Sequence, residues 1–115
     1  MHLAKDAARA YAATASARSH REQEADLFWR VNTVLDRSRT QGPLERARAL
    51  ADNRRLWALV IGLLRDPDNA LPPPLRASII SVGLCVQREM DGKEPNIDFL
   101  LSVNENIAAG LAGRT

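Results

Sequence analysis

The sequence predicts an all-α protein, a single-domain bundle of four helices preceded by an N-terminal arm. Apolar residues recur at the three-to-four residue spacing of a helix face, and no useful stretch alternates with period two. Clusters of proline, glycine and turn-forming residues divide these segments. A chain of 115 residues suits one domain with one core. The helices are expected at about residues 20–39, 44–65, 74–91 and 97–111.

The N-terminal region combines an alanine-rich arm with the start of the first long helix. Residues 1–18 show little periodicity and are expected to form a loosely helical arm or a short docked helix. Ser19 stands three residues before Glu22, which is the spacing of a capping box, so a helix is expected to begin there. Trp29 falls almost opposite the core-facing stripe. Either the arm with Tyr11 covers it, or it anchors another protein, because tryptophan is enriched at binding hot spots. The stripe itself is expected to comprise Leu27, Phe28, Val31, Val34 and Leu35.

The second helix is expected to be the central rod of the bundle. Its second half, "LWALVIGLL" over residues 56–64, is apolar on every side, which is typical of a helix covered all round. Asp66 should end it, because a residue before proline is pushed out of the helical region. The first half is amphipathic through Leu44, Ala47, Leu50 and Ala51.

The third and fourth helices each show one apolar stripe. Prolines 72–74 suit the first turn of the third helix, where the missing amide proton costs no hydrogen bond. Asn96 is expected to cap the fourth helix, and Asp98 suits its positive end. The stripes are Leu75, Ile79, Val82, Gly83, Val86 and Met90, then Ile97, Leu100, Val103, Asn104, Ile107 and Leu111.

Composition argues against several classes of function. Sixteen basic and fourteen acidic residues are intermixed, which is typical of a solvated surface rather than a nucleic-acid site. The longest apolar run, residues 56–64, is far shorter than the about twenty residues of a membrane span. The single cysteine, Cys85, fits a reducing compartment. No phosphate-binding loop, nucleophile elbow or zinc-site spacing occurs, so we expect no enzyme, no metal and no cofactor.

Two asparagines fall on apolar stripes. Asn53 shares a face with Leu50, Trp57 and Leu64, and Asn104 lies in the middle of the last stripe. A buried amide without partners costs about 1–3 kcal/mol, so both should be hydrogen-bonded. They either fix helix register, as a lone polar residue does in a coiled coil, or bond to each other or to a partner's backbone across a groove floor. Of Arg54 and Arg55, one is expected to flank the Trp57 stripe and the other to face solvent.

Three segments together resemble the FlaF family, small flagellar biosynthesis regulators of alphaproteobacteria. They are "NRRLW", "DPDNALPPPLRASIISVGLCV" and "VNENIAAGLAG", in that order and with suitable linkers, and "AYAATA" resembles the family's opening. The similarity covers about residues 8–113, and the chain departs from the pattern by an extra proline in "LPPPLR". The family's most recognisable positions fall on Asn53, Arg54, Leu56, Trp57, Asp66, Pro67, Asn69, Leu71, Pro72, Leu75, Arg76, Asn104, Asn106, Ile107, Ala108, Gly110 and Leu111.

The resemblance implies a cytoplasmic protein without enzymatic activity that is needed to produce flagellin and assemble the filament. Such proteins are thought to act on flagellin as a secretion chaperone, or to link its export to its synthesis, alongside a second regulator, FlbT. Combined with the helical pattern, it suggests a bundle whose apolar groove accepts an amphipathic terminal segment of flagellin. The predicted partner-binding residues are Trp29, Asn53, Arg54, Trp57, Asn104, Ile107 and Leu111.

Two other interpretations remain open from the sequence. The protein could regulate flagellin expression after transcription, acting through RNA or a partner regulator without holding flagellin. It could also be a structural subunit that works as a stable oligomer.

Overall fold

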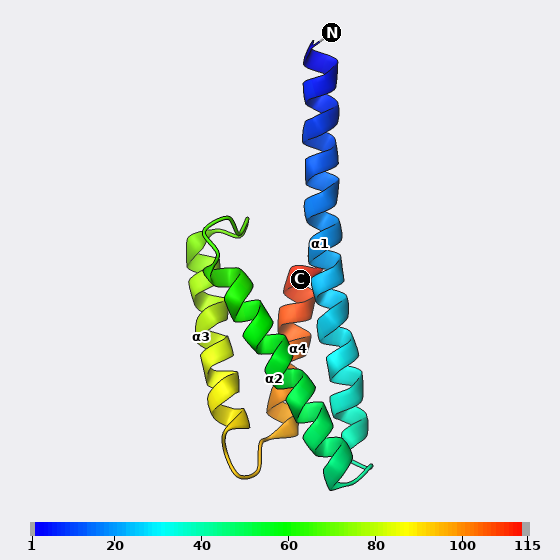
Figure 1. The fold of residues 1–115 in the computed structure, drawn as a ribbon, viewed down its shortest axis with the longest axis vertical. Helices are drawn as coiled ribbons and strands as arrows, with labels where there is room; N and C mark the ends of the chain where they lie inside the picture. The colour runs from blue at the N-terminus through cyan, green and yellow to red at the C-terminus, as the bar shows by residue number, and fades with distance from the viewer. Residues whose placement is uncertain (1, 114–115) are drawn as a thin grey trace.

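The computed structural model describes residues 2–113, except for the side chains of residues 2, 3 and 11–19. Within these residues it is entirely helical. The four helices are α1 (His2–Ser38), α2 (Pro43–Arg65), α3 (Pro73–Met90) and α4 (Ile97–Leu111) (Figure 1). The described part measures 62 × 25 × 23 Å, because the N-terminal half of α1 extends beyond the other three helices. No helix in it has the length and apolar character needed to cross a membrane.

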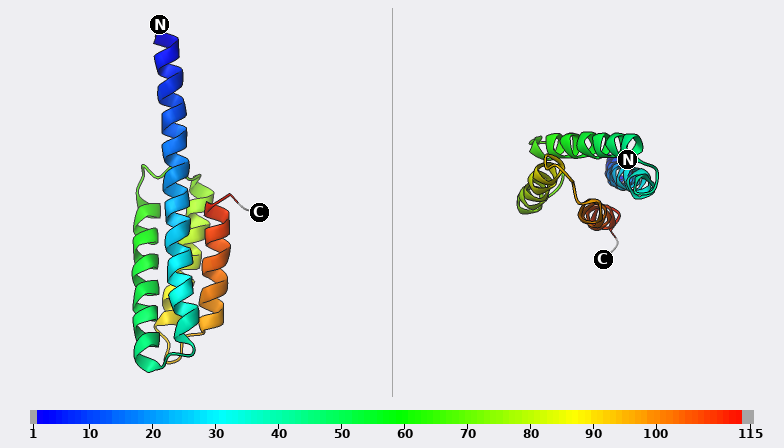
Figure 2. Two further views of the ribbon diagram at one scale, coloured as in Figure 1. Left: turned by 90° about the vertical axis from the view of Figure 1, so that its right-hand side faces the viewer. Right: turned by 90° about the horizontal axis from the view of Figure 1, so that it is seen from below.

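The helices surround a common core in which α1 and α2 make most of the contacts (Figure 2). α1 packs against α2 and α4, and α2 also packs against α3. The loop after α3 carries the chain across to α4, which lies along α1 although the two helices are distant in sequence. The second helix is therefore not a central rod, because Leu59 and Leu63 on its outer face are exposed.

The first helix begins much earlier than predicted. α1 runs from His2 to Ser38, and the helical arm is its direct continuation rather than a separate element. The expected start at Ser19 is wrong, because a capping serine has non-helical backbone, whereas the chain here is helical on both sides. Alanine has the highest helix propensity, and no proline or glycine interrupts residues 2–38. Tyr11 and Trp29 lie on the same helix, so the arm does not fold back over Trp29.

The buried face of α1 differs from the predicted stripe. Leu27 and Val34 are 41% and 43% exposed, whereas Asn32 and Ser38 are buried. The Ser38 hydroxyl donates to the carbonyl of Leu35 at 2.6 Å. A polar side chain can lie in a core when it is hydrogen-bonded, and hydrophobicity alone does not reveal this. The buried positions are Ala25, Phe28, Asn32, Leu35 and Ser38, which recur at three- or four-residue intervals.

The buried face of α2 was also predicted incorrectly in its first half. Leu44 is 62% exposed, and Ala47 and Ala51 are exposed as well. In the second half, Leu59 and Leu63 are exposed, so this segment is not covered on all sides. α2 packs most extensively against α1 and α3 and keeps an outward face. The buried residues are Ala49, Asn53, Leu56, Trp57, Ile61 and Leu64.

The last two helices follow the predicted pattern more closely. α3 buries Ile79, Gly83, Val86 and Met90, although Leu75 is exposed. Helix α4 buries Leu100, Leu101, Asn104 and Ala108. The Asn96 cap is confirmed, since its side-chain oxygen accepts from the amide of Phe99 at 3.1 Å.

Gly83 marks the closest approach of α3 to α2. A Cβ atom there would lie 2.9 Å from both Ile61 Cδ1 and Trp57 Cε3. Such contacts are too short for real carbon atoms, so the absence of a side chain permits the packing of these two helices.

Candidate functional site

Asn104 is the centre of a buried hydrogen-bond network. Its side-chain oxygen accepts from Trp57 Nε1 at 2.8 Å. Its amide nitrogen donates to the oxygens of Asn32 and Asn53 at 2.8 and 2.7 Å. Asn53, Trp57 and Asn104 are fully buried. The network therefore joins α1, α2 and α4 in the middle of the bundle.

The two outer asparagines complete the network. Asn53 Nδ2 donates to the Met90 sulfur at 3.1 Å, which adds α3, and Asn32 Nδ2 donates to the Leu101 carbonyl at 3.1 Å. The ring of Phe28 packs edge-on against that of Trp57, with 5.5 Å between the centroids. Because these amides are saturated by internal partners, their arrangement favours the role of fixing helix register. A direct contact with another protein through them stays a prediction, and it would require the bundle to open.

Arg54 links two helices at the surface of the bundle. Its guanidinium donates to Asp91 Oδ1 at 2.7 Å and to the Met90 carbonyl at 3.1 Å, which ties α2 to the end of α3. Arg55 instead pairs with Asp52 of its own helix at 2.6 Å. The structure thus gives Arg54 a role in joining α2 to α3, and its predicted contact with a partner stays a prediction.

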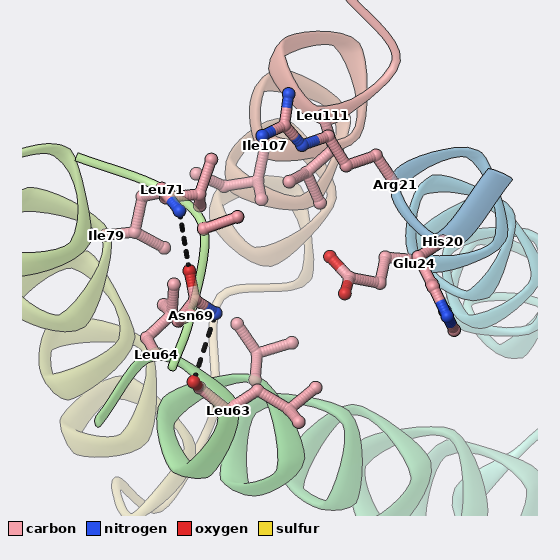
Figure 3. A pocket seen from close by; sticks show the side chains of 12 residues that line it. His20, Arg21, Glu24, Leu63, Leu64, Asn69, Leu71, Ile79, Ile107 and Leu111 are labelled. Carbon is pink, nitrogen blue, oxygen red and sulfur yellow. Dashed lines mark hydrogen bonds between the residues drawn. The ribbon is translucent and has the colours of Figure 1, made fainter. Parts of the chain in front are cut away.

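The proline-rich stop between α2 and α3 is a loop held by side-chain hydrogen bonds. The Asn69 amide donates to the Leu63 carbonyl at 3.1 Å, and its oxygen accepts from the amide of Leu71 at 3.0 Å (Figure 3). Arg76, in the first turns of α3, donates to the Asp66 carbonyl at 3.1 Å. These bonds fix the loop against the end of α2 and place Leu71 beside the core.

This loop forms one wall of an apolar pocket of about 240 Å³ (Figure 3). The middle of α1, the ends of α2 and α4, and the start of α3 supply the other walls. Its volume is below the roughly 300–1,000 Å³ of small-molecule sites, so it fits a few side chains of a partner better than a metabolite. Its apolar lining is Val60, Leu63, Leu64, Ala70, Leu71, Ile79, Ile107 and Leu111, and its polar lining is His20, Arg21, Glu24 and Asn69.

Glu24 places a carboxylate among these apolar side chains. It points into the space beside Leu63 and Ile107, whereas His20 points away (Figure 3). Among the described residues, no hydrogen-bond donor or ion-pair partner contacts the carboxylate. Desolvation by burial raises the pKa of Glu24 above 4.5, and the charges of His20 and Arg21 only partly oppose this.

The pocket contains two of the predicted partner-binding residues, Ile107 and Leu111. Sequence reasoning did not identify Leu63, Leu71 or Glu24 as part of a site. Leu63 belongs to the run of residues assumed to be covered on all sides, and Leu71 belongs to a loop. Glu24 could have been identified by its position. It lies next to Ala25 and one turn before Phe28, at the edge of the buried face of α1.

Trp29 belongs to a different surface. It lines an open depression of about 430 Å³ between α1 and α4, and its side chain is 36% exposed. The rest of this lining is largely polar and includes the ion pair of Arg39 and Asp98 at 2.6 Å. The structure does not bring Trp29 together with Ile107 and Leu111. Its predicted contact with a partner would involve a second surface.

Across the described part of the chain, no three histidine, cysteine, aspartate or glutamate residues are grouped so that they could hold a metal ion. Cys85 is a free thiol and is exposed. The guanidinium of Arg88 lies 3.4 Å from its sulfur.

Comparison with known proteins gives one match. The model of a family described as flagellar protein FlaF matches residues 7–111, nearly the whole chain. The searches of the curated proteins and of the solved structures found no match to this chain.

Proposed function

The chain belongs to the FlaF family of flagellar proteins, and from this membership and the apolar pocket we propose that it binds an amphipathic segment of flagellin. The bound segment would be one of flagellin's terminal segments, held in the cytoplasm before export. Filament assembly uses the apolar faces of these segments, so an unassembled subunit needs them covered. The proposed activity is binding and involves no catalysis.

The pocket is the observation that carries this proposal. Eight apolar residues from three helices and one loop line it, and α1 adds polar residues to the lining. Leu59 and Leu63 are exposed one turn apart on α2, so an apolar strip lies beside the opening. An amphipathic helix binds such a surface by inserting anchors spaced three, four and seven residues apart.

The test is a calorimetric titration of the protein with flagellin monomer and with its separate N- and C-terminal segments. Saturable binding is expected for at least one of them. Leu63→Asp should weaken binding at least about tenfold, because it places a charge in the proposed contact surface. Leu63 is 43% exposed, so the variant should still fold.

Leu44→Asp is the matched control. Leu44 is exposed at the first turn of α2, the end of the helix remote from Leu63, and an acidic residue is favourable at that position. It should bind flagellin as the unaltered protein does. If the unaltered protein shows no saturable binding to flagellin or to either segment, the chaperone function is wrong.

A salt titration separates this proposal from regulation through RNA. Apolar contacts depend little on added salt, whereas contacts to phosphates weaken steeply. Flagellin binding that is nearly constant between about 50 and about 200 mM salt supports the pocket as the site. Binding to the flagellin transcript in place of the protein would favour the alternative.

A further inference from the structure

The most unusual group in the pocket is the Glu24 carboxylate. A carboxylate that is partly removed from water is normally paired or hydrogen-bonded. Here α2 presents only Val60, Leu63 and Leu64 to the pocket, and α4 presents only Ile107 and Leu111. None of these side chains carries a charge or a donor.

The polar residues around the pocket do not supply the missing partner. The Asn69 side chain is engaged with Leu63 and Leu71. Arg21 points toward Leu111 and forms no ion pair with Glu24, and His20 points out of the pocket (Figure 3). Among the described residues, therefore, no counter-charge contacts the Glu24 carboxylate, and the nearby charges of His20 and Arg21 only partly offset its burial.

We infer that the segment that binds in this pocket carries a lysine or arginine that pairs with Glu24 while neighbouring apolar side chains fill the pocket. This inference rests on the proposed function and specifies the chemistry of the partner. A basic residue one turn from an apolar anchor lies on the same face of an amphipathic helix, and its aliphatic stem packs on apolar walls. A charge-assisted hydrogen bond would then replace the solvation that Glu24 loses.

Two substitutions at Glu24 test the inference with flagellin monomer as the probe. Glu24→Gln keeps the size of the side chain but removes its charge, and it should weaken binding about five- to tenfold. Glu24→Leu should weaken binding more, because it would leave the partner's cation buried without any acceptor. Glu22→Gln, an exposed substitution on the same helix, is the matched control and should bind normally.

Glu24→Leu distinguishes a partner that carries a basic residue from a partner that contributes only apolar groups. If the partner contributes only apolar groups, a leucine at position 24 enlarges the apolar surface, and binding becomes tighter. Equal or tighter binding by this variant, with normal binding by the unaltered protein, overturns the inference and leaves the proposed function intact. Failure of the unaltered protein to bind flagellin overturns the proposed function itself, and this inference with it.

The pH dependence of binding provides a second readout. Only the ionised carboxylate pairs with a cation, so affinity should fall as the pH is lowered from neutral toward the raised pKa of Glu24. Glu24→Gln should lose this dependence. His20 is the neighbouring histidine, so His20→Gln is measured alongside and should keep the profile of the unaltered protein. A profile that disappears in His20→Gln and persists in Glu24→Gln contradicts the inference.

Discussion

The centre of the bundle and the pocket at its end differ in whether their polar side chains have hydrogen-bond partners. In the centre, three asparagines and Trp57 bond to one another until each side-chain group has a partner. At the end, the Glu24 carboxylate lies among apolar side chains, and no partner contacts it in the described part of the chain. A satisfied buried network stabilises one arrangement of helices, whereas an unsatisfied group is stabilised by whatever supplies its missing partner. This difference supports an architectural role for the centre and the proposed binding role for the pocket.

Asn104→Leu should have the largest effect, because it breaks the centre. The substitution nearly preserves volume but leaves Trp57 Nε1 and two asparagine oxygens buried without partners. The free energy of unfolding should fall by about 3–5 kcal/mol, as measured by urea denaturation. Asn106→Leu, exposed on the same helix, should change it by less than about 0.5 kcal/mol. A loss below about 1 kcal/mol for Asn104→Leu would mean that the network contributes little.

A methyl group at Gly83 tests how closely α2 and α3 must pack beside the central network. Gly83→Ala would bring a carbon to within 2.9 Å of the Trp57 ring, so the free energy of unfolding should fall by about 1–3 kcal/mol. In Gly62→Ala the new carbon meets nothing within 4 Å. That variant should gain about 0.5–1 kcal/mol, because alanine favours a helix interior. Similar effects at both positions would show that α3 can shift away from α2.

The smallest expected effect concerns the stability of the free protein at Glu24. Its pKa is raised in the folded state, so the folded protein binds more protons than the unfolded chain at pH values just above 4.5. Stability therefore falls as the pH rises from 4.5 through the raised pKa. Glu24→Gln should match the unaltered protein at low pH and melt up to about 4 °C higher at neutral pH.

Thermal melts at several pH values measure this difference, with Glu22→Gln as the control. If Glu24→Gln were instead less stable at neutral pH, the carboxylate would already have a stabilising partner in the free protein. Such a result would remove the contrast between the two regions.

The prediction of the helices succeeded where local signals were strong. The prolines at the start of α3, the Asn96 cap and the Asp66–Pro67 stop placed their boundaries within one residue of those observed, and α2 begins one residue before the predicted Leu44. The start of α1 was missed because the capping-box spacing at Ser19 was given more weight than the alanine content before it. A short motif predicts a cap only where the backbone before it leaves the helix.

The candidate site was harder to predict than the helices. In the sequence, residues of the buried centre and residues of the pocket fall on the same kind of apolar stripe. Asn53, Trp57 and Asn104 stood out as polar or aromatic residues on apolar stripes, and the structure places all three in the core. Ile107 and Leu111 were predicted as partner-binding residues together with them, and the structure places these two at the pocket. Whether a side chain faces the interior or an opening depends on the neighbouring helices, which periodicity does not describe.

The sequence by itself determined that the chain is helical, where three of its helices begin and end, and to which family it belongs. These properties depend on local propensity, on proline and cap chemistry, and on matched residues along nearly the whole chain. Only the tertiary structure decided which face of each helix is buried, that Asn32 completes the central network, and that Glu24 lies unpaired in an apolar pocket. Burial and pairing are relations between helices distant in sequence, so they are set by how the helices pack together.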